Sequence, residues 1–301
     1  MMSLSLVRRL SLHPSFNSRY TVGYTAQRFK SDTCKVLTVS SGKGGVGKTT
    51  TAASFSYGLA QKGFKTVVID FDIGLRNLDI HFGCERRVIF DFVNVIQNEC
   101  TLSQALIKDK RVPTLSILAA SQTKDKTVLT EEGVGRVLDE LKKDFDYIVC
   151  DSPAGIESGA RHASYFADEA IICTNPELSS CRDSDKMIGF IASQSLRAIE
   201  NRPAVVQKLL VTRYDPARAE KEETLSLFDI EELLGLPLVG VIPESSTVLT
   251  STNLGQPIIS MDDKAGKAYL DAVDRYLGEE VPLRFITAEK KGFFTRMFGS
   301  D

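Results

Sequence analysis

The stretch Gly42-Lys43-Gly44-Gly45-Val46-Gly47-Lys48-Thr49 follows a short apolar run at Lys35–Ser40 and matches the pattern GxxxxGK[ST]. Glycines let the backbone turn tightly and point its N–H groups inward at phosphate oxygens, where a side chain would collide. The Lys48 ammonium is then expected to reach the β and γ phosphates of a nucleotide, and the Thr49 hydroxyl to ligate Mg²⁺. A strand, this loop and a following helix therefore predict a phosphate-binding unit.

The helix after the loop is predicted to run from about Lys48 to Lys62, with Gly63 as its C-terminal stop. Its N-terminus presents the positive end of the helix dipole to the same phosphates. The loop residues predicted to bind the nucleotide are Gly42, Gly44, Gly45, Val46, Gly47, Lys48, Thr49 and Thr50. Lys43 is a second lysine at the front of the loop, and composition alone is equally compatible with a solvated cation there.

Two acidic clusters follow apolar, β-branched runs. Asp70 and Asp72 come after Thr66–Ile69, and Asp151 comes after Tyr147–Cys150. Carboxylates at the carboxyl ends of strands lie where open α/β sheets bind ligands. We expect Asp151 to hold the metal or its water. Asp70 and Asp72 face the same way on an extended chain, so one would lie nearer the metal and the other toward the γ phosphate.

Seven apolar runs, separated mostly by helical patterns, indicate a single domain. The runs lie at 36–40, 66–70, 115–119, 147–151, 170–174, 208–213 and 238–242. Helical patterns such as Glu131–Lys142 and Ser184–Arg197 lie between them. Strands that alternate with helices imply right-handed crossovers and a mainly parallel sheet covered on both faces. The predicted fold is α/β, one P-loop NTPase domain over 32–282 with a doubly wound sheet of about seven to eight strands.

Charge is spread unevenly along the chain. The formal net charge is −2, but five cations precede Asp32, and without them 32 basic and 39 acidic residues leave a net charge of −7. A body this acidic argues against broad, non-specific binding of nucleic acid, which needs a concentrated positive surface.

The first 31 residues have the composition of an organellar transit peptide. They contain five cations, six serines and no acid, and Arg8 and Arg9 interrupt a short apolar set. The early arginines favour the mitochondrion, with the protein in the matrix and peripheral on the inner membrane. The alternatives are the chloroplast stroma and inner envelope, or a solvated basic arm of the mature protein.

The six cysteines include no CxxC pair, and their spacing fits neither a zinc site nor a small disulfide scaffold. We expect reduced thiols, with Cys150 and Cys173 packed in the core. An iron–sulfur carrier would need paired cysteines to bridge a cluster between subunits, so this class of function is disfavoured.

The C-terminal segment, 283–301, is predicted to hold an amphipathic membrane-targeting helix. Aromatic and apolar side chains recur at i, i+1, i+4 and i+5 and are flanked by cations, which is typical of a helix in the headgroup plane. The residues are Lys290, Lys291, Phe293, Phe294, Arg296, Met297 and Phe298. One copy should bind an anionic membrane weakly, and two copies on a dimer should bind by avidity. The alternative is a tail that packs its phenylalanines on the protein's own core.

Several longer stretches, with the phosphate loop, resemble the septum-site-determining ATPases of the deviant Walker A (ParA/MinD) group. They are Ser41–Thr50, Val68–Asp79, Gly83–Val88, Gln104–Arg111, Cys150–Glu157 and Tyr165–Ala170. The resemblance extends from about Lys35 to the C-terminus.

The resemblance implies ATP and Mg²⁺ as ligands and a nucleotide-sandwich homodimer in which Lys43 crosses to the ATP of the partner subunit. It also implies that Asp72 orients the attacking water, that Asp70 lies near the metal shell and that Asp151 is the Walker B acid. The catalytic residues would be Lys43, Lys48 and Asp72, and the metal residues Thr49, Asp70 and Asp151. Adenine would be held by Arg213, Pro243 and Glu244 at the ends of late strands.

The resemblance further implies a partner surface for a MinE-like activator and a MinC-like division inhibitor. Its residues are Asn77, in the first switch, and Arg182, Asp183, Asp185 and Lys186, on the helix after residue 177. The predicted function is an ATPase that dimerises on ATP, binds a membrane and helps place an organelle division site. A ParA-like ATPase that partitions DNA or other cargo is the alternative, and a small-molecule ligase is a further one.

Overall fold

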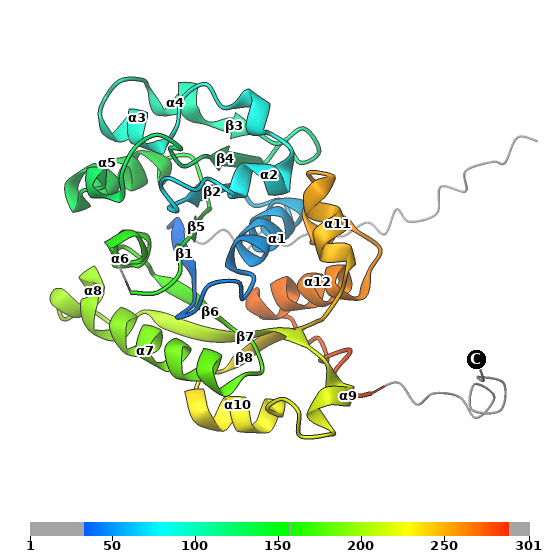
Figure 1. Cartoon of the computed structure of the whole chain (residues 1–301). Helices are drawn as coiled ribbons and strands as arrows, with labels where there is room; N and C mark the ends of the chain where they lie inside the picture. The colour runs from blue at the N-terminus through cyan, green and yellow to red at the C-terminus, as the bar shows by residue number, and fades with distance from the viewer. Residues whose placement is uncertain (1–32, 157, 289–301) are drawn as a thin grey trace, which may run out of the picture.

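The computed structural model describes residues 33–156 and 158–288, in which helices flank a sheet of eight strands (Figure 1). The strand order is β3-β4-β2-β5-β1-β6-β7-β8, and every neighbouring pair is parallel except β3 with β4. The strands are β1 (Lys35–Ser40), β2 (Thr66–Asp70), β3 (Ile107–Lys108), β4 (Leu115–Leu118), β5 (Tyr147–Asp151), β6 (Glu169–Thr174), β7 (Val206–Tyr214) and β8 (Leu238–Pro243).

Twelve α-helices and three short 3₁₀-helices are found in the described ranges. The α-helices are α1 (Lys48–Gln61), α2 (Leu78–Phe82), α3 (Phe92–Ile96), α4 (Leu102–Ala105), α5 (Glu131–Leu141), α6 (Ser158–Tyr165), α7 (Leu178–Gln194), α8 (Leu196–Ile199), α9 (Pro216–Ala219), α10 (Leu227–Leu234), α11 (Thr247–Asn253) and α12 (Lys264–Tyr276). The 3₁₀-helices are η1 (Glu85–Arg87), η2 (Lys126–Val128) and η3 (Ile258–Ser260).

Alternate residues of the central strands enter different cores, because successive side chains of a strand point to opposite faces of the sheet. In β1, Leu37 and Val39 pack in the cluster that contains α1 and α12, whereas Val36 packs in the cluster that contains α3 and α5. Figure 1 shows α1, α11 and α12 on one side of the sheet and α5, α6 and α7 on the other. The predicted doubly wound α/β fold is confirmed.

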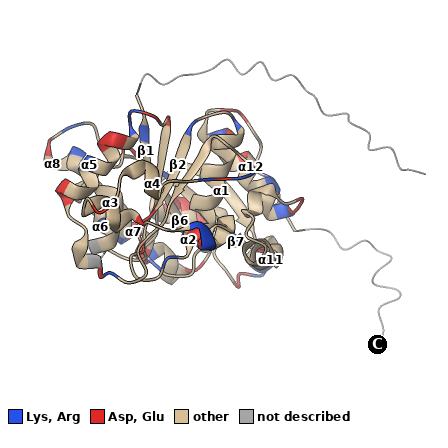
Figure 2. Ribbon diagram, turned by 90° about the horizontal axis from the view of Figure 1, so that it is seen from above, with Lys and Arg blue, Asp and Glu red and all other residues tan. Residues whose placement is uncertain are grey.

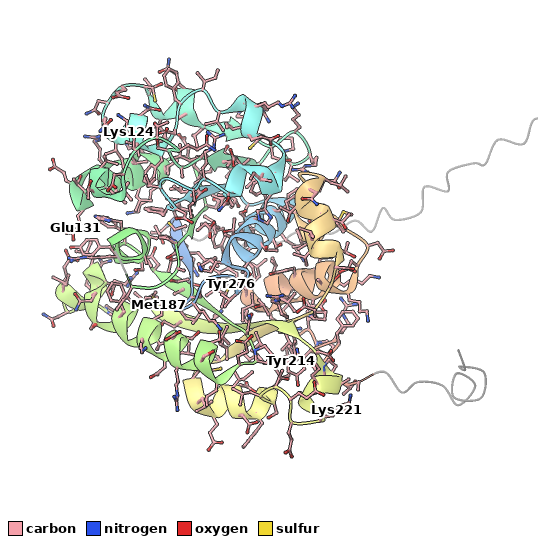
Figure 3. The ribbon with its side chains drawn as sticks, viewed as in Figure 1. Lys124, Glu131, Met187, Tyr214, Lys221 and Tyr276 are labelled. Carbon is pink, nitrogen blue, oxygen red and sulfur yellow. The ribbon has the colours of Figure 1, made fainter. Side chains whose placement is uncertain are left out.

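The side chains of the described residues fill the two layers between sheet and helices (Figure 3). Tyr276 of α12 and Met187 of α7 are buried on opposite faces of the sheet, and Lys221 and Lys124 lie at the periphery. All six cysteines are free, and four of them are buried, in agreement with the expected reduced thiols.

The seven predicted apolar runs correspond to strands, and β3 was missed. This strand has two residues and is the antiparallel edge of the sheet, so it is too short to produce an alternating pattern. The helix predicted from Ser184 begins six residues earlier, at Leu178, and ends at Gln194, where Ser195 takes an extended conformation and caps the next helix. The helices predicted at Lys48 and Glu131 begin at those residues.

The carboxyl ends of β1, β2 and β5 lie side by side in the middle of the sheet. Asp151 pairs in register with Val39 on one side and with Asp70 on the other. The phosphate loop leaves β1 at the same edge, so strand order alone brings the loop and two of the predicted acids together.

Packing continues past residue 282, the predicted end of the ATPase domain. Leu283 and Ile286 pack against the cluster of buried residues around β7, β8 and α10. Arg284 forms two hydrogen bonds of 2.6 Å to the carboxylate of Asp271 on α12. The predicted transit peptide and the membrane residues 290–298 lie outside the described residues.

Charged residues of both signs are interspersed around the rim of the domain (Figure 2). None of the helices in the described ranges has the length and apolar character needed to cross a bilayer.

Replacing Phe55 by Ala should destabilise the fold by about 3–5 kcal/mol, because it leaves a cavity between α1 and α12. Phe55 is fully buried, and its ring meets that of Tyr276 edge to face with 5.9 Å between centroids. Urea unfolding measures the change. Phe228→Ala is the matched control, since this residue is 73% exposed, and its effect should stay within about 0.5 kcal/mol. Equal losses in the two variants would contradict this description of the core.

Candidate functional site

The loop between β1 and α1 has the backbone that its glycines permit. Gly45 and Gly47 adopt left-handed conformations with φ of 76° and 90°. At Gly42 the reason for glycine is space, because a Cβ atom there would lie 2.0 Å from the carbonyl oxygen of Asp183 on α7. The loop thus packs closely against α7 at Gly42, and glycine loops of this kind bind anions through their backbone N–H groups.

Lys48 is buried, and neutral oxygens are its hydrogen-bond partners. Its Nζ donates to Ser41 Oγ at 3.0 Å and to the Lys43 carbonyl at 3.4 Å. Burial lowers the pKa of Lys48, and the nearby Asp151 opposes that shift. A buried cation whose hydrogen-bond partners among the described residues are neutral oxygens is suited to receive a phosphate group.

Asp151, at the end of β5, is fully buried beside the loop. Its Oδ1 has no hydrogen-bond partner among the described residues, and its side chain is hydrogen-bonded to Thr49. Burial, followed by the charge of Asp70, raises the pKa of Asp151 well above its usual range. An unsatisfied carboxylate oxygen next to a threonine hydroxyl fits Mg²⁺, which binds through few protein ligands together with phosphates. Within the described ranges no group of three or more His, Cys, Asp or Glu side chains could hold a metal ion alone.

Asp70 organises the segment that follows it. Its Oδ1 accepts a hydrogen bond from the Asp72 amide at 2.9 Å, and its Oδ2 accepts from the amides of Asn77 at 3.2 Å and Leu78 at 3.1 Å. Burial raises its pKa to about 7, although these amides act in the opposite direction. The sequence suggested a position near the metal shell, and the structure adds that both carboxylate oxygens hold the loop 72–78, hereafter the switch segment.

Asp72 lies within this switch segment and is half-buried. Its carbonyl accepts hydrogen bonds from the amides of Leu75 and Arg76, which closes a tight turn. Its charge acts on Lys48, Asp70 and Asp151, so the structure brings Asp72 into the same electrostatic cluster.

Lys43 points away from Lys48 and toward the start of α7. Its Nζ donates to Glu177 Oε2 at 2.8 Å and to Ser179 Oγ at 3.3 Å, with the lysine and glutamate side chains 40% and 51% exposed. The hydrogen bond from Lys43 lowers the pKa of Glu177. An ion pair this exposed contributes little to stability and can be exchanged for another partner.

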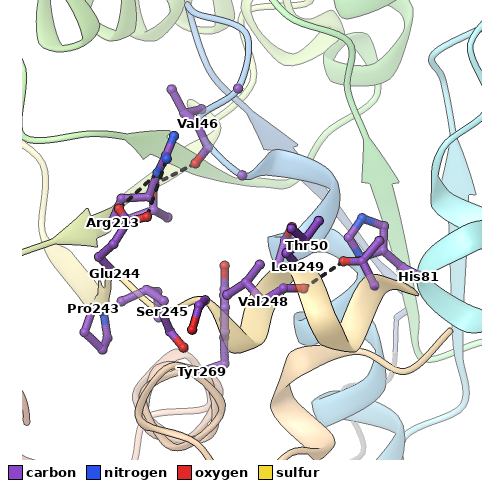
Figure 4. Close-up of a pocket in the computed structure, with 16 residues that line it drawn as sticks. Val46, Thr50, His81, Arg213, Pro243, Glu244, Ser245, Val248, Leu249 and Tyr269 are labelled. Atoms are coloured by element: carbon purple, nitrogen blue, oxygen red, sulfur yellow. Dashed lines mark hydrogen bonds and ion pairs between the residues drawn. The ribbon is translucent and has the colours of Figure 1, made fainter. Parts of the chain in front are cut away.

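A cavity of about 490 Å³ opens beside the loop (Figure 4). The ends of β7 and β8 form one side, where Arg213 makes two hydrogen bonds to Glu244, at 3.1 and 3.4 Å. Helix α11 and His81 form the opposite side. The loop residues that line the cavity are Gly45, Val46, Gly47 and Thr50. The three residues predicted to hold adenine, Arg213, Pro243 and Glu244, thus lie together next to the phosphate loop.

The predicted partner residues divide between two places. Arg182, Asp185 and Lys186 are exposed on α7, and Lys186 pairs with Asp183 at 3.1 Å. Asn77 lies at the N-terminus of α2, with its amide hydrogen-bonded to Asp70.

Several residues of the site were missed by sequence reasoning. Ser41 holds Lys48, Glu177 holds Lys43, and Thr212 donates to the Val46 carbonyl at 2.7 Å. His81, Thr252 and Tyr269 line the cavity. Only Ser41, adjacent to the loop, carried a local signal, since the others come from segments that the fold alone brings together.

This fold and this site define the class of protein: a P-loop nucleotide hydrolase with a second lysine at the front of its phosphate loop. A family model described as an AAA domain matches residues 34–201. The septum site-determining protein MinD of Escherichia coli (strain K12) is 61% identical over 267 residues, which cover 88% of this chain and 99% of that protein.

Solved structures agree. The MinC:MinD cell division protein complex of Aquifex aeolicus matches with a TM-score of 0.73 and 38% identity, over 83% of this chain and 99% of that chain. MinD of Pyrococcus horikoshii complexed with Mg-ADP matches with a TM-score of 0.70 and 26% identity, over 81% and 96%. The chain belongs to the MinD family of septum site-determining ATPases. The predicted use of ATP and Mg²⁺ is confirmed at the level of this family.

The prediction of a mitochondrial or chloroplast location is wrong. The matched septum site-determining proteins are bacterial. A segment rich in serine and arginine and poor in acids carries positive charge. A transit peptide shares this property with any basic arm, so composition was not sufficient to assign an organelle.

Asp151→Asn should raise the melting temperature in EDTA and abolish the additional stabilisation that Mg²⁺ gives in the presence of ADP. The amide relieves the cost of burying the Asp151 charge, which outweighs the attraction to Lys48 because burial raises the pKa of Asp151 well above its usual range. It also removes the charged metal ligand. Differential scanning calorimetry measures both effects, the first on the order of 1 kcal/mol. Asp139→Asn, at a carboxylate that is 74% exposed, is the control. A variant that still responds to Mg²⁺ as the wild type does would rule out Asp151 as the metal site.

Proposed function

We propose that the protein is a Mg²⁺-dependent ATPase that dimerises on ATP, attaches to a membrane and takes part in placing a division site. The observation that carries this proposal is the buried Lys48 ammonium, held by neutral oxygens at 3.0 and 3.4 Å beside the unsatisfied Asp151 carboxylate. The adjoining cavity of about 490 Å³ has room for a nucleoside.

In the proposed site the loop amides and Lys48 bind the phosphates, and Thr49 and Asp151 hold Mg²⁺. Mg²⁺ held there would supply positive charge against the phosphates. Asp72 orients the water that attacks the γ phosphate, which its position in the Lys48 and Asp151 cluster supports. Asp70 sets the position of Asp72, because its Oδ1 accepts the Asp72 amide hydrogen.

Dimerisation would place Lys43 against the nucleotide of a second subunit. Lys43 is accessible at the edge of the site, and its present partner, Glu177, is also exposed. Large apolar side chains are exposed in the segments next to the site, Leu75 in the switch segment at 64%, Ile156 after β5 at 53% and Leu178 at the start of α7 at 47%. Burying them against a second copy would favour a dimer with the nucleotides at its interface.

The membrane step rests on the sequence of residues 290–298, which lie outside the described residues. Three cations of about 1 kcal/mol each on an anionic surface, together with four apolar side chains, give weak binding by one tail. A dimer carries two tails and gains avidity, so ATP binding would promote attachment and hydrolysis would release it.

The exposed face of α7 is the proposed surface for partner proteins. MinC is the partner in the solved Aquifex aeolicus complex, and a MinC-like inhibitor and a MinE-like activator are proposed here. Arg182, Asp185 and Lys186 present both signs of charge on this face, and the same helix begins beside Glu177, the residue that holds Lys43. A protein bound to α7 is therefore placed to affect the position of Lys43.

Lys43→Ala and Asp72→Ala should each lower the rate of ATP hydrolysis at least about 100-fold, while ADP binds with little change. Phosphate release and binding of a fluorescent ADP analogue measure the two properties. Lys221→Ala, which removes an exposed lysine in the segment after α9, is the control. Turnover near that of the wild type in both variants would overturn the mechanism.

A chain truncated before Lys290 should lose its ATP-dependent co-sedimentation with anionic liposomes. The full chain with ADP and the full chain with neutral liposomes are the controls, since each lacks one of the two required interactions. Unchanged sedimentation of the truncated chain would remove the tail from the account.

A further inference from the structure

Three parts of the chain outside the phosphate site are in contact at the C-terminal ends of α2 and α11. They are Gly83, which follows α2, Arg111, which ends the stretch Gln104–Arg111, and Gly255, which follows α11. A Cβ atom added to Gly255 would lie 2.5 Å from Gly83 Cα, and one added to Gly83 would lie 3.2 Å from Gly255 Cα. Both residues have positive φ. The ends of α2 and α11 thus pack backbone against backbone, at a distance that only glycine allows.

Arg111 binds both helix ends at this contact. One guanidinium nitrogen donates to the Gly255 carbonyl at 2.8 Å, and the other donates to the Phe82 carbonyl at 3.1 Å. Carbonyls at helix C-termini lack partners within the helix, so a cation there is favourable. The guanidinium group of Arg111 is in turn held by Asp109, whose Oδ2 accepts a hydrogen bond from it at 2.8 Å. Burial opposes ionisation of Asp109, but the hydrogen bonds from Arg111 keep its pKa below the usual range.

The other side of this contact faces the nucleoside cavity. His81, on α2, and Thr252, on α11, both line it, with 3.4 Å between His81 Nδ1 and Thr252 Oγ1. Val248 and Leu249 of α11 form the rest of this wall (Figure 4). Burial lowers the pKa of His81 to about 4, so the imidazole is neutral at physiological pH and adds no charge to the cavity.

Helix α2 is also attached to the phosphate end of the site. The amides of Asn77 and Leu78, where α2 begins, bind the same Asp70 carboxylate that holds the Asp72 amide. One five-residue helix therefore joins the switch segment at its start to the cavity wall at its end.

We propose that Arg111 is a positioning residue that fixes the α11 wall of the nucleoside cavity to α2, so that contact with the nucleoside restrains the switch segment. This inference rests on the proposed nucleotide site. Arg111 is not one of the residues that line the cavity, and it acts through the carbonyls of Phe82 and Gly255 without touching the ligand.

The first test compares two ligands that share the phosphate loop, Mg·ADP and Mg·pyrophosphate, by calorimetric titration of the full chain. Arg111→Ala should raise the Kd of Mg·ADP about tenfold and leave that of Mg·pyrophosphate within about twofold, because only ADP uses the α11 wall. Arg111→Lys should give a smaller change in the same direction, since an ammonium cannot reproduce the fork. Arg111→Lys also supplies the comparison if Arg111→Ala does not fold.

Arg87→Ala is the matched control. Its guanidinium donates to the carbonyl of Lys108, the residue before Asp109, at 2.9 Å. The inference would be overturned if the ratio of the Kd of Mg·ADP to that of Mg·pyrophosphate were the same in both Arg111 variants as in the wild type. If the wild type binds neither ligand, the proposed function fails, and this inference fails with it.

Amide hydrogen exchange tests the link to the switch segment. In the wild type, Mg·ADP should slow exchange over residues 72–83 more than Mg·pyrophosphate does, and in Arg111→Lys the two ligands should protect these residues equally. Equal protection by both ligands in the wild type would show that the nucleoside end does not restrain this segment and would overturn the proposal.

Discussion

The Lys48 ammonium is buried at the end of a glycine loop with two neutral oxygens as its hydrogen-bond partners, and the rest of the site is organised around this charge. The low dielectric that makes a buried cation costly also makes it bind an incoming phosphate strongly. Ser41 and the Lys43 carbonyl hold it in place, and the charge of Asp151 partly offsets the cost of burial. The fold supports this arrangement because the loop is fixed between α1 and α7.

The order of the strands then assigns the other roles. Placing β5 between β1 and β2 sets Asp151 and Asp70 in register, two buried acids with different partners. Asp151 has one carboxylate oxygen without a hydrogen-bond partner among the described residues, and both oxygens of Asp70 accept from the switch segment. Two aspartates at the ends of neighbouring strands therefore differ in their partners: backbone amides bind Asp70, whereas Asp151 Oδ1 has no hydrogen-bond partner among the described residues.

The parts of this molecule that depend on local pattern could be predicted. The strand, loop and helix around Lys48 and the seven longer strands were evident from residue order and periodicity. The role of Asp70 was harder to predict, since nothing in the sequence shows that the amides of Asn77 and Leu78 donate hydrogen bonds to its carboxylate. The wall of the cavity could not be predicted, because His81 and Thr252, which are in contact there, are 171 residues apart in the chain. The location of the protein could not be predicted from composition, because composition gives the charge of a segment and does not show which receptor binds it.

If the buried Lys48 charge is the principal binding element for the nucleotide phosphates, its removal should weaken binding. Titration calorimetry of Mg·ADP with Lys48→Met and with the wild type measures this. Methionine keeps the length and packing of the side chain and removes the charge. We expect one site per wild-type chain and at least about 100-fold weaker binding by the variant, because charged hydrogen bonds to phosphate are lost. Binding by Lys48→Met within a few-fold of the wild type would contradict it.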